Sequence, residues 1–247
     1  MKKLLLLCLC IPWLVSASPM QQKHLSVIDI AGMVAGGGFS EKAGPLSNSV
    51  YGTQTSITTT TTANVAAGDL VVVGLCYISD KHSFNSVTDT AGNTYISEDA
   101  IEHSATGNRL LYSVATESSA TNAITANLTY LGAGSARTSI VAWVFSANGT
   151  ITRYATAGVG YDWSTTIQTP EFSTRAKNTI VFTVNTTGLE RTLSDLDIGG
   201  AGVDNSAQLQ QVMTFFKTFT ASQTNIRASL TSTGTTGAIR ATVFEAE

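Results

Sequence analysis

Cysteine is scarce in this sequence, with three residues among 247. Two of them, Cys8 and Cys10, lie in an apolar stretch at the N-terminus, and Cys76 is the third. If that stretch is removed, the one remaining thiol cannot form a disulfide within the chain. A hydrophobic core must then stabilise the fold, and the chain is long enough to form one. Cys76 lies in the run LVVVGLCYI, so we expect a buried side chain, with an intermolecular disulfide as the alternative.

Charge is scarce as well: charged residues make up 13% of the chain, and the net charge is −3. Lysine and arginine form no cluster along the sequence. Because binding of nucleic acid requires clustered basic residues, we expect no nucleic-acid partner. Threonine is the commonest residue; it keeps a surface polar without charge and favours β-strands.

Familiar catalytic motifs are missing: the sequence contains neither G-x-S-x-G nor H-E-x-x-H. Its histidines, His24, His82 and His103, are far apart. A glycosidase needs two carboxylates across a cleft, and the best pair is Asp195 and Asp197 in LSDLDIGG, on one face of a strand. Acids beside a glycine turn more often cap the turn. We expect no catalytic residues, no metal site and no cofactor, and keep a glycoside-active enzyme as the last alternative.

The N-terminus has the layout of a secretory signal peptide. Lys2 and Lys3 precede an apolar core at 4–15, and Val-Ser-Ala at 15–17 is a small-residue cleavage site. The core is shorter than the about 20 residues that span a membrane, and no second run of that length follows. We therefore expect removal of residues 1–17 and no stable membrane span. The expected location is secreted, extracellular or at the cell surface, with the periplasm as the alternative.

Residues 18–50 differ in composition from the rest of the chain. They contain a short alternating piece at 27–30 and a glycine run at 36–38. We predict a flexible, glycine-rich N-terminal arm that can add one strand to the body. Residues 51–247 form the predicted β-sandwich domain.

Apolar and polar residues alternate with a period of two in several runs. The clearest runs are 122–130, 178–187 and 225–232. One apolar and one polar face indicate a sheet with one side on the core and one in water. The runs Leu70–Ile78 and 140–145 are apolar on both faces, which predicts central strands whose second face is covered by the arm or a long loop. The predicted fold is an all-β antiparallel sandwich, with jelly-roll topology.

The stretch SVTDTAGNTY, at 86–95, brings an aspartate, a glycine and an asparagine close together. Asp and Asn side chains bond nearby backbone amides, and glycine adopts positive φ, so residues 89–93 are predicted to close a hairpin. Calcium is the weaker alternative. It needs about six oxygen ligands, of which Asp89 and Asn93 supply only a part.

Several segments together resemble a block in exported bacterial and phage proteins. They are AAGDLVVVGLCY, SVTDTAGNTY, LLYSVAT, ITANLTY and IVAWVFS, and the likeness is best over residues 66–146. The chain is similar to that uncharacterised family in its G-D strand and its V-x-D-x-x-G-N-x-[YW] hairpin, and departs from it in SANGT after IVAWVF. The resemblance implies a sandwich like those of adhesive or carbohydrate-binding modules. It carries over no catalytic residues.

The segment GVGYDWSTT, at 158–166, is the candidate binding segment. Tyr161 and Trp163 flank Asp162 in a predicted loop that two glycines open. Aromatic faces stack on sugar rings, and a carboxylate accepts hydrogen bonds from hydroxyls, so all three are candidate ligand-binding residues. In the alternative, Tyr161 or Trp163 folds back and plugs the end of the sandwich, since large aromatic side chains are mostly buried.

The sequence therefore favours an exported, non-catalytic β-sandwich for carbohydrate binding or surface attachment, whose partner is a glycan or another cell-surface ligand. The alternative is a structural subunit of an extracellular filament, matrix or virion surface. Such a subunit would self-assemble through the N-terminal arm or the threonine-rich edge TQTSITTTTTAN. Sequons at Asn127, Asn148 and Asn185 are interpreted as chance matches.

Overall fold

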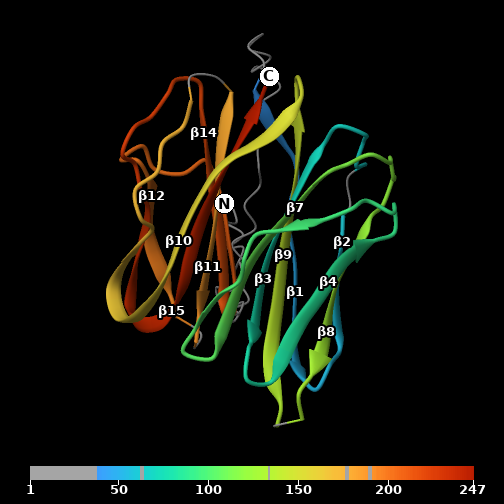
Figure 1. The fold of residues 1–247 in the computed structure, drawn as a ribbon, viewed down its shortest axis with the longest axis vertical. Coiled ribbons are helices and arrows are strands. Elements are labelled where there is room, and N and C mark those ends of the chain that lie inside the picture. The colour runs from blue at the N-terminus through green and yellow to red at the C-terminus, as the bar shows by residue number, and fades with distance from the viewer. Residues whose placement is uncertain (1–37, 62–63, 133, 176–177, 189–190) are drawn as a thin grey trace, which may run out of the picture. The chain divides into compact units, whose positions relative to one another are not determined.

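The computed structural model describes residues 38–61, 64–132, 134–175, 178–188 and 191–247. Within these ranges the chain forms antiparallel sheets and no helix, which confirms the predicted all-β class (Figure 1). Accordingly, the described residues offer no helix with the length and apolar character to cross a membrane. The predicted signal peptide and the arm residues up to 37 lie outside the described residues.

The strands fall into three sheets. The central sheet contains β1 (Phe39–Gly52), β3 (Leu70–Ile78), β5 (Ile96–Ser97), β6 (Ile101–His103), β7 (Thr106–Val114) and β9 (Ala136–Ala147). The C-terminal sheet contains β10 (Ile151–Gln168), β11 (Thr179–Thr187), β12 (Leu193–Ile198), β13 (Asn205–Leu209), β14 (Val212–Phe219) and β15 (Ala228–Ala246). The small sheet contains β2 (Ser56–Thr60), β4 (His82–Asp89) and β8 (Ala123–Tyr130).

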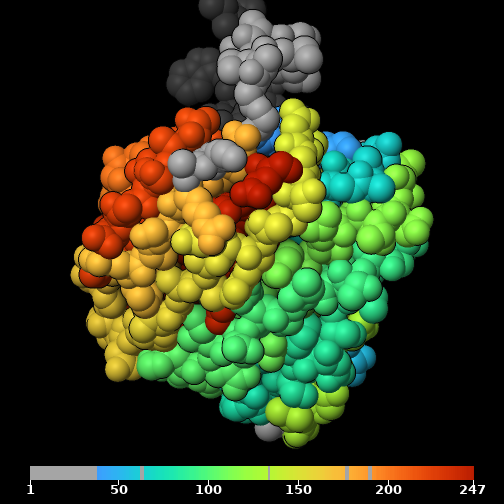
Figure 2. All heavy atoms as spheres, turned by 45° about the horizontal axis from the view of Figure 1, so that its top comes forward, coloured from blue at the N-terminus to red at the C-terminus, as the bar shows by residue number. Residues whose placement is uncertain are grey.

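The central and C-terminal sheets face each other across a shared core, which confirms the predicted sandwich (Figure 1). Their strand orders are β1-β9-β3-β7-β5, with β6 on β7, and β10-β15-β11-β14-β13, with β12 on β15. A jelly roll passes repeatedly between its facing sheets. The chain does so between the central and the small sheet, which share a core and have the jelly-roll orders β1-β9-β3-β7 and β2-β8-β4, so the predicted topology is found in residues 39–147. To the C-terminal sheet the chain passes once, from β9 to β10. The two halves of the chain accordingly occupy separate parts of the surface in Figure 2.

Strand β3 is apolar on both faces because it separates two cores. Val71 and Val73 pack toward the small sheet, whereas Leu70 and Val72 pack toward the C-terminal sheet. The prediction of a central strand with both faces covered is confirmed. The cover on the outer side is a third sheet, in the order β2-β8-β4, rather than the arm or a long loop.

The core between the two larger sheets is rich in aromatic rings. The ring centres of Trp143 and Phe145 lie 5.2 and 4.9 Å from the ring centre of Phe216, and both pairs meet edge to face. The buried Trp143 Nε1 donates to Thr214 Oγ1 at 2.9 Å, which satisfies the one polar atom of the indole. Cys76 lies in the same core with no exposed surface, and burial raises its pKa to about 12. Its predicted role as a buried small side chain is confirmed.

Alternation predicts the exposure of β8 correctly but not that of β11. In β8, Ile124, Ala126 and Leu128 are buried and the residues between them are more exposed. In β11 every residue is buried. Val181, on the face expected to meet water, packs in a third core with residues of β10, β12 and β15. The sequon residue Asn185 lies in this buried strand with no exposed surface, which makes it inaccessible to modification.

The described part of the predicted arm belongs to the sandwich. Strand β1 pairs with β9 from Phe39 opposite Ala147 to Gly52 opposite Ala136. The described residues from 38 onward belong to one compact unit, which therefore includes residues 38–50 of the predicted arm. Register shifts between residues 41 and 46, around a Gly-Pro pair, interrupt the period of two and hide this strand in the sequence.

Candidate functional site

The candidate binding segment is a bulged strand rather than a loop. It lies in β10, where Tyr161 pairs with Gly237 and Ser164 pairs with Thr235 of β15. Two residues of β10, Asp162 and Trp163, therefore oppose one residue of β15. Such a β-bulge breaks the strict alternation of side chains. In consequence, both Asp162 and Trp163 are exposed, while Tyr161 is partly buried.

The glycines that suggested a loop instead make room for strand β6. A Cβ on Gly158 would lie 2.4 Å from Ile101 Cδ1, and a Cβ on Gly160 would lie 2.8 Å from His103. A side chain at position 160 would clash with His103, and one at position 158 would displace the end of Ile101, so the glycines let β6 approach β10 closely. This correction explains why the glycines occur inside a strand.

Tyr161 has the role of the plug that the sequence left open. Its hydroxyl donates to Asn185 Oδ1 at 2.9 Å, with the Thr186 carbonyl as an alternative acceptor at 3.2 Å. Burial raises its pKa. A Cβ on Gly237 would meet the Thr186 carbonyl and the Tyr161 hydroxyl, so glycine is required opposite the plug.

Trp163 is exposed and supported from below. Its side chain is 66% exposed. A Cβ on Gly234 would lie 2.6 Å from Trp163 Nε1, so the indole lies directly against this backbone. The Arg191 guanidinium carbon lies 5.7 Å from the centre of the Trp163 ring, a cation–π contact. The structure thus holds the indole in place and presents it to solvent.

Asp162 contacts His103, so its carboxylate is not a free hydrogen-bond acceptor between Tyr161 and Trp163. Its Oδ1 lies 2.9 Å from His103 Nε2, and its side chain is 91% exposed. His103 ends β6 just before a turn in which Ser104 and Ala105 both have positive φ. This exposed contact joins the hairpin to β10, at a surface where such contacts stabilise little.

A cavity of about 550 Å³ lies near Trp163, and Arg191 links the two. The cavity, called the arginine cavity below, is lined by Tyr51, Ile78, Lys81, Ser135, Ala136, Arg137, Arg191 and Gln211. Three of these described lining residues are cationic and none is acidic. Lys81 also pairs with Asp80, at 2.9 Å.

A second exposed ring borders the arginine cavity. Tyr51 is 66% exposed, and the Arg137 guanidinium carbon lies 6.0 Å from the centre of its ring. Arg137 Nη1 also donates to Gln210 Oε1. Each arginine of the cavity therefore lies over an aromatic face.

Two polar atoms at the arginine cavity have no partner among the described residues. Gln211 is 8% exposed; its Nε2 donates to the Gly188 carbonyl at 2.8 Å, but its Oε1 accepts nothing. Arg191 Nε is likewise buried and without a hydrogen-bond partner in the described part of the chain. Buried polar atoms in proteins are usually paired, so these two mark a place where a further molecule can bind.

A second hollow, of about 440 Å³, shares Arg191 with the arginine cavity. It is lined by Arg191, Thr192, Gln208 and Gln210. The Gln208 amide donates to the Arg191 carbonyl, which fixes the backbone between the two hollows. The surface around Arg191 therefore extends beyond one small cavity.

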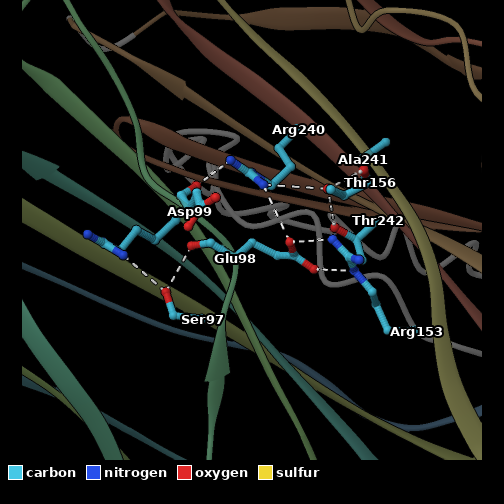
Figure 3. A network of polar contacts seen from close by, with 9 residues as sticks. Ser97, Glu98, Asp99, Arg153, Thr156, Arg240, Ala241 and Thr242 are labelled. Carbon is cyan, nitrogen blue, oxygen red and sulfur yellow. Dashed lines mark hydrogen bonds and ion pairs between the residues drawn. The ribbon is translucent and has the colours of Figure 1, made fainter.

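Another charged cluster is internal and structural (Figure 3). The Glu98 carboxylate accepts from Arg153 Nε at 2.7 Å and from Arg153 Nη2 at 2.8 Å. Arg240 Nη1 lies 3.7 Å from Glu98 Oε2, and Arg240 Nη2 donates to the Asp99 carbonyl. This cluster, the Glu98 network, joins the segment after β5 to β10 and β15.

The proposed carboxylate pair, Asp195 and Asp197, is committed to local structure. Asp197 accepts from the amides of Gly200 and Gly202, at 2.7 and 2.8 Å. Asp195 has a φ of 48° and accepts from Thr231 Oγ1 at 2.5 Å. A register shift between residues 194 and 197 breaks the shared face on which the pair was predicted.

Asp89 is an anchor between sheets and does not close a hairpin. It ends β4 in the small sheet, and the chain then enters the central sheet at β5. Asp89 Oδ2 accepts from Asn93, Tyr95 and Asn122, and Oδ1 accepts from the Asn93 amide. Burial raises the pKa of Asp89, but these hydrogen bonds outweigh it and lower the pKa overall. Both oxygens that the calcium alternative would use already bind protein donors.

Comparisons with models of protein families, with curated proteins and with solved structures find no match. The resemblance to exported bacterial and phage proteins therefore stays a prediction. No group of three or more potential metal-binding His, Cys, Asp or Glu side chains occurs in the described ranges. The function must therefore be inferred from the geometry of the site. Of its residues, the sequence predicted Trp163 but not Tyr51, Arg137, Arg191 or Gln211.

Proposed function

We propose that the protein is an exported, non-catalytic saccharide-binding protein that attaches to glycans at or outside the cell surface. The observation that carries the proposal is the indole of Trp163, which contacts the Gly234 backbone near its Nε1, lies 5.7 Å from the Arg191 guanidinium carbon and keeps 66% of its surface exposed. An indole face of this kind suits the apolar C–H face of a sugar ring. The location rests on the predicted signal peptide.

The arginine cavity supplies the polar half of such a site. Its volume of about 550 Å³ falls within the range of about 300–1,000 Å³ of small-molecule sites. Its guanidinium, ammonium and amide groups can bond sugar hydroxyls, while Tyr51 adds a second exposed ring. An apolar platform beside a few fixed polar groups is the usual composition of a ligand site.

The experiment that tests the proposal compares Trp163→Ala with the wild type on an array of neutral, amino and acidic saccharides. We expect the wild type to bind a defined group of saccharides. The variant should lose at least about tenfold in affinity, because ring stacking contributes on the order of 1 kcal/mol beyond buried area.

Ile96→Ala is the matched control. Ile96 is 55% exposed and lies in β5, outside the arginine cavity, so its truncation also removes exposed apolar surface but should leave binding unchanged. An array on which the wild type binds nothing would refute the proposal. Equal binding by wild type and Trp163→Ala would refute the role of the indole.

A further inference from the structure

The charge of the arginine cavity restricts the kind of saccharide it can hold. The chain has a net charge of −3, yet the described lining carries Lys81, Arg137 and Arg191. Lys81 pairs with Asp80. Arg191, which lies between the cavity and the second hollow, faces aromatic surface instead. Such a lining favours an anionic group on the ligand.

The two unpartnered atoms require different chemistry from one ligand. Arg191 Nε carries a hydrogen and needs an acceptor, whereas Gln211 Oε1 needs a donor. A carboxylate or a sulfate only accepts hydrogen bonds. A hydroxyl can donate to Gln211 but carries no charge for the guanidinium. A molecule with both groups on one frame satisfies both atoms.

We infer that the arginine cavity binds an acidic saccharide whose sugar ring carries a carboxylate as well as hydroxyls. The inference rests on the proposed function and specifies its ligand. The carboxylate faces Arg191, since guanidinium and carboxylate form strong paired hydrogen bonds. A ring hydroxyl donates to Gln211 Oε1, and the ring stacks on Trp163. Because two hollows share Arg191, the bound form is a chain of several such sugars.

The test uses pairs of polysaccharides that differ only in charge. Polygalacturonate and alginate are each compared with their own ester, in which the carboxylates are neutral. We expect the full-length mature protein to bind at least one acid about tenfold more tightly than its ester. The affinity for the acid should also fall with added salt, since salt screens the attraction of opposite charges.

Arg191→Gln should weaken binding of the acid much more than binding of the ester, so that the about tenfold preference of the wild type for the acid disappears. Arg227→Gln is the matched control, because Arg227 is an exposed arginine paired with Glu171 at 3.1 Å, outside the arginine cavity. The comparison of acid with ester in the wild type needs no variant, so the inference stays testable even if Arg191→Gln fails to fold.

The outcomes separate the two levels of the argument. Equal affinity for each acid and its ester, with both reduced by Trp163→Ala, would overturn the acidic ligand and leave saccharide binding intact. Equal affinity for dextran sulfate and the uronates would also overturn it, since a sulfate-bearing polymer would then suffice. If no polysaccharide on the array binds at all, the proposed function itself fails.

Discussion

Strand β10 passes through two charged regions whose arginines have opposite surroundings. Near its start, Arg153 joins Arg240 around the carboxylate of Glu98, and that carboxylate has 8% of its side-chain surface exposed (Figure 3). Near its end, Trp163 lies under Arg191, whose Nε is buried without a partner among the described residues. The first region contains its own anion. The second presents cationic and aromatic surface to a cavity.

The difference separates structural arginines from ligand-binding ones. The hydrogen bonds to Glu98 raise the pKa of Arg153, whereas burial lowers the pKa of Arg240. The negative charge of Glu98 stabilises both arginines, so the network supplies its own counterion. An internal ion network of this kind fastens two sheets together. An arginine over an indole gains little from the contact alone and keeps its edges for another molecule.

The largest expected effect comes from breaking the Glu98 network. Glu98→Gln keeps the shape of the side chain but removes its negative charge. The buried Arg240, 7% exposed, then loses the carboxylate that lies beside it. Removal of one member of a buried ion pair commonly costs about 3 kcal/mol or more. We expect a loss of about 3 kcal/mol in the free energy of unfolding, measured by urea denaturation, with saccharide binding unchanged.

Glu171→Gln is the control for this prediction. Glu171 also pairs with an arginine, Arg227, but both side chains are about half exposed, at 52% and 43%. Exposed pairs contribute about 0–1 kcal/mol, so the unfolding curve should hardly move. If both substitutions had the same small effect, the Glu98 network would not be the structural element described above.

The strand content and the central position of β3 could be predicted because they depend on local alternation. In Leu70–Ile78 the residues on both faces of the strand are apolar, so both faces must be covered by other parts of the protein. The pattern does not say what supplies the cover. A small sheet does so here, and a third core hides the polar face of β11. Such cover depends on contacts between residues far apart in the sequence.

The candidate site was predictable only in part, for the same reason. Trp163 stands out locally, as an aromatic residue after glycines. Arg191 and Gln211 have no such local mark, because the fold brings them to the cavity from separate segments, together with Tyr51 of β1. The bulge at Asp162 and Trp163 could not be foreseen either, since it arises from the pairing with β15.

A smaller effect is expected from the neighbour of the indole. Tyr161→Phe removes the hydroxyl that donates to Asn185 Oδ1, a group with no exposed surface. Loss of one partner of a buried hydrogen bond costs about 1–3 kcal/mol. We expect a loss of about 1 kcal/mol in the free energy of unfolding, followed by circular dichroism in urea, and unchanged affinity for saccharides.

Trp163→Ala should give the reverse pattern, with weakened binding and a smaller change in stability, since two thirds of the indole surface is already exposed. The pair of variants therefore tests whether adjacent residues of β10 divide the two roles. Weakened binding by Tyr161→Phe, with normal stability, would place Tyr161 in the ligand platform and contradict its role as a plug.

The smallest effect is expected at Asp162, where the two interpretations of the segment differ most. If Asp162 accepted hydrogen bonds from sugar hydroxyls, Asp162→Asn would lose about tenfold in affinity, since hydrogen bonds to charged groups are strong. In the structure its carboxylate is 91% exposed and bound to His103, and asparagine can keep that contact through its amide oxygen.

Removal of the negative charge of Asp162 should only reduce repulsion of an acidic saccharide, and salt screens that repulsion. We therefore expect affinity for the uronate polymer to rise by less than about twofold at low salt and to match the wild type at about 0.15 M salt, measured by titration. A tenfold loss would return Asp162 to the binding site and show that the bulge presents a carboxylate as well as a ring.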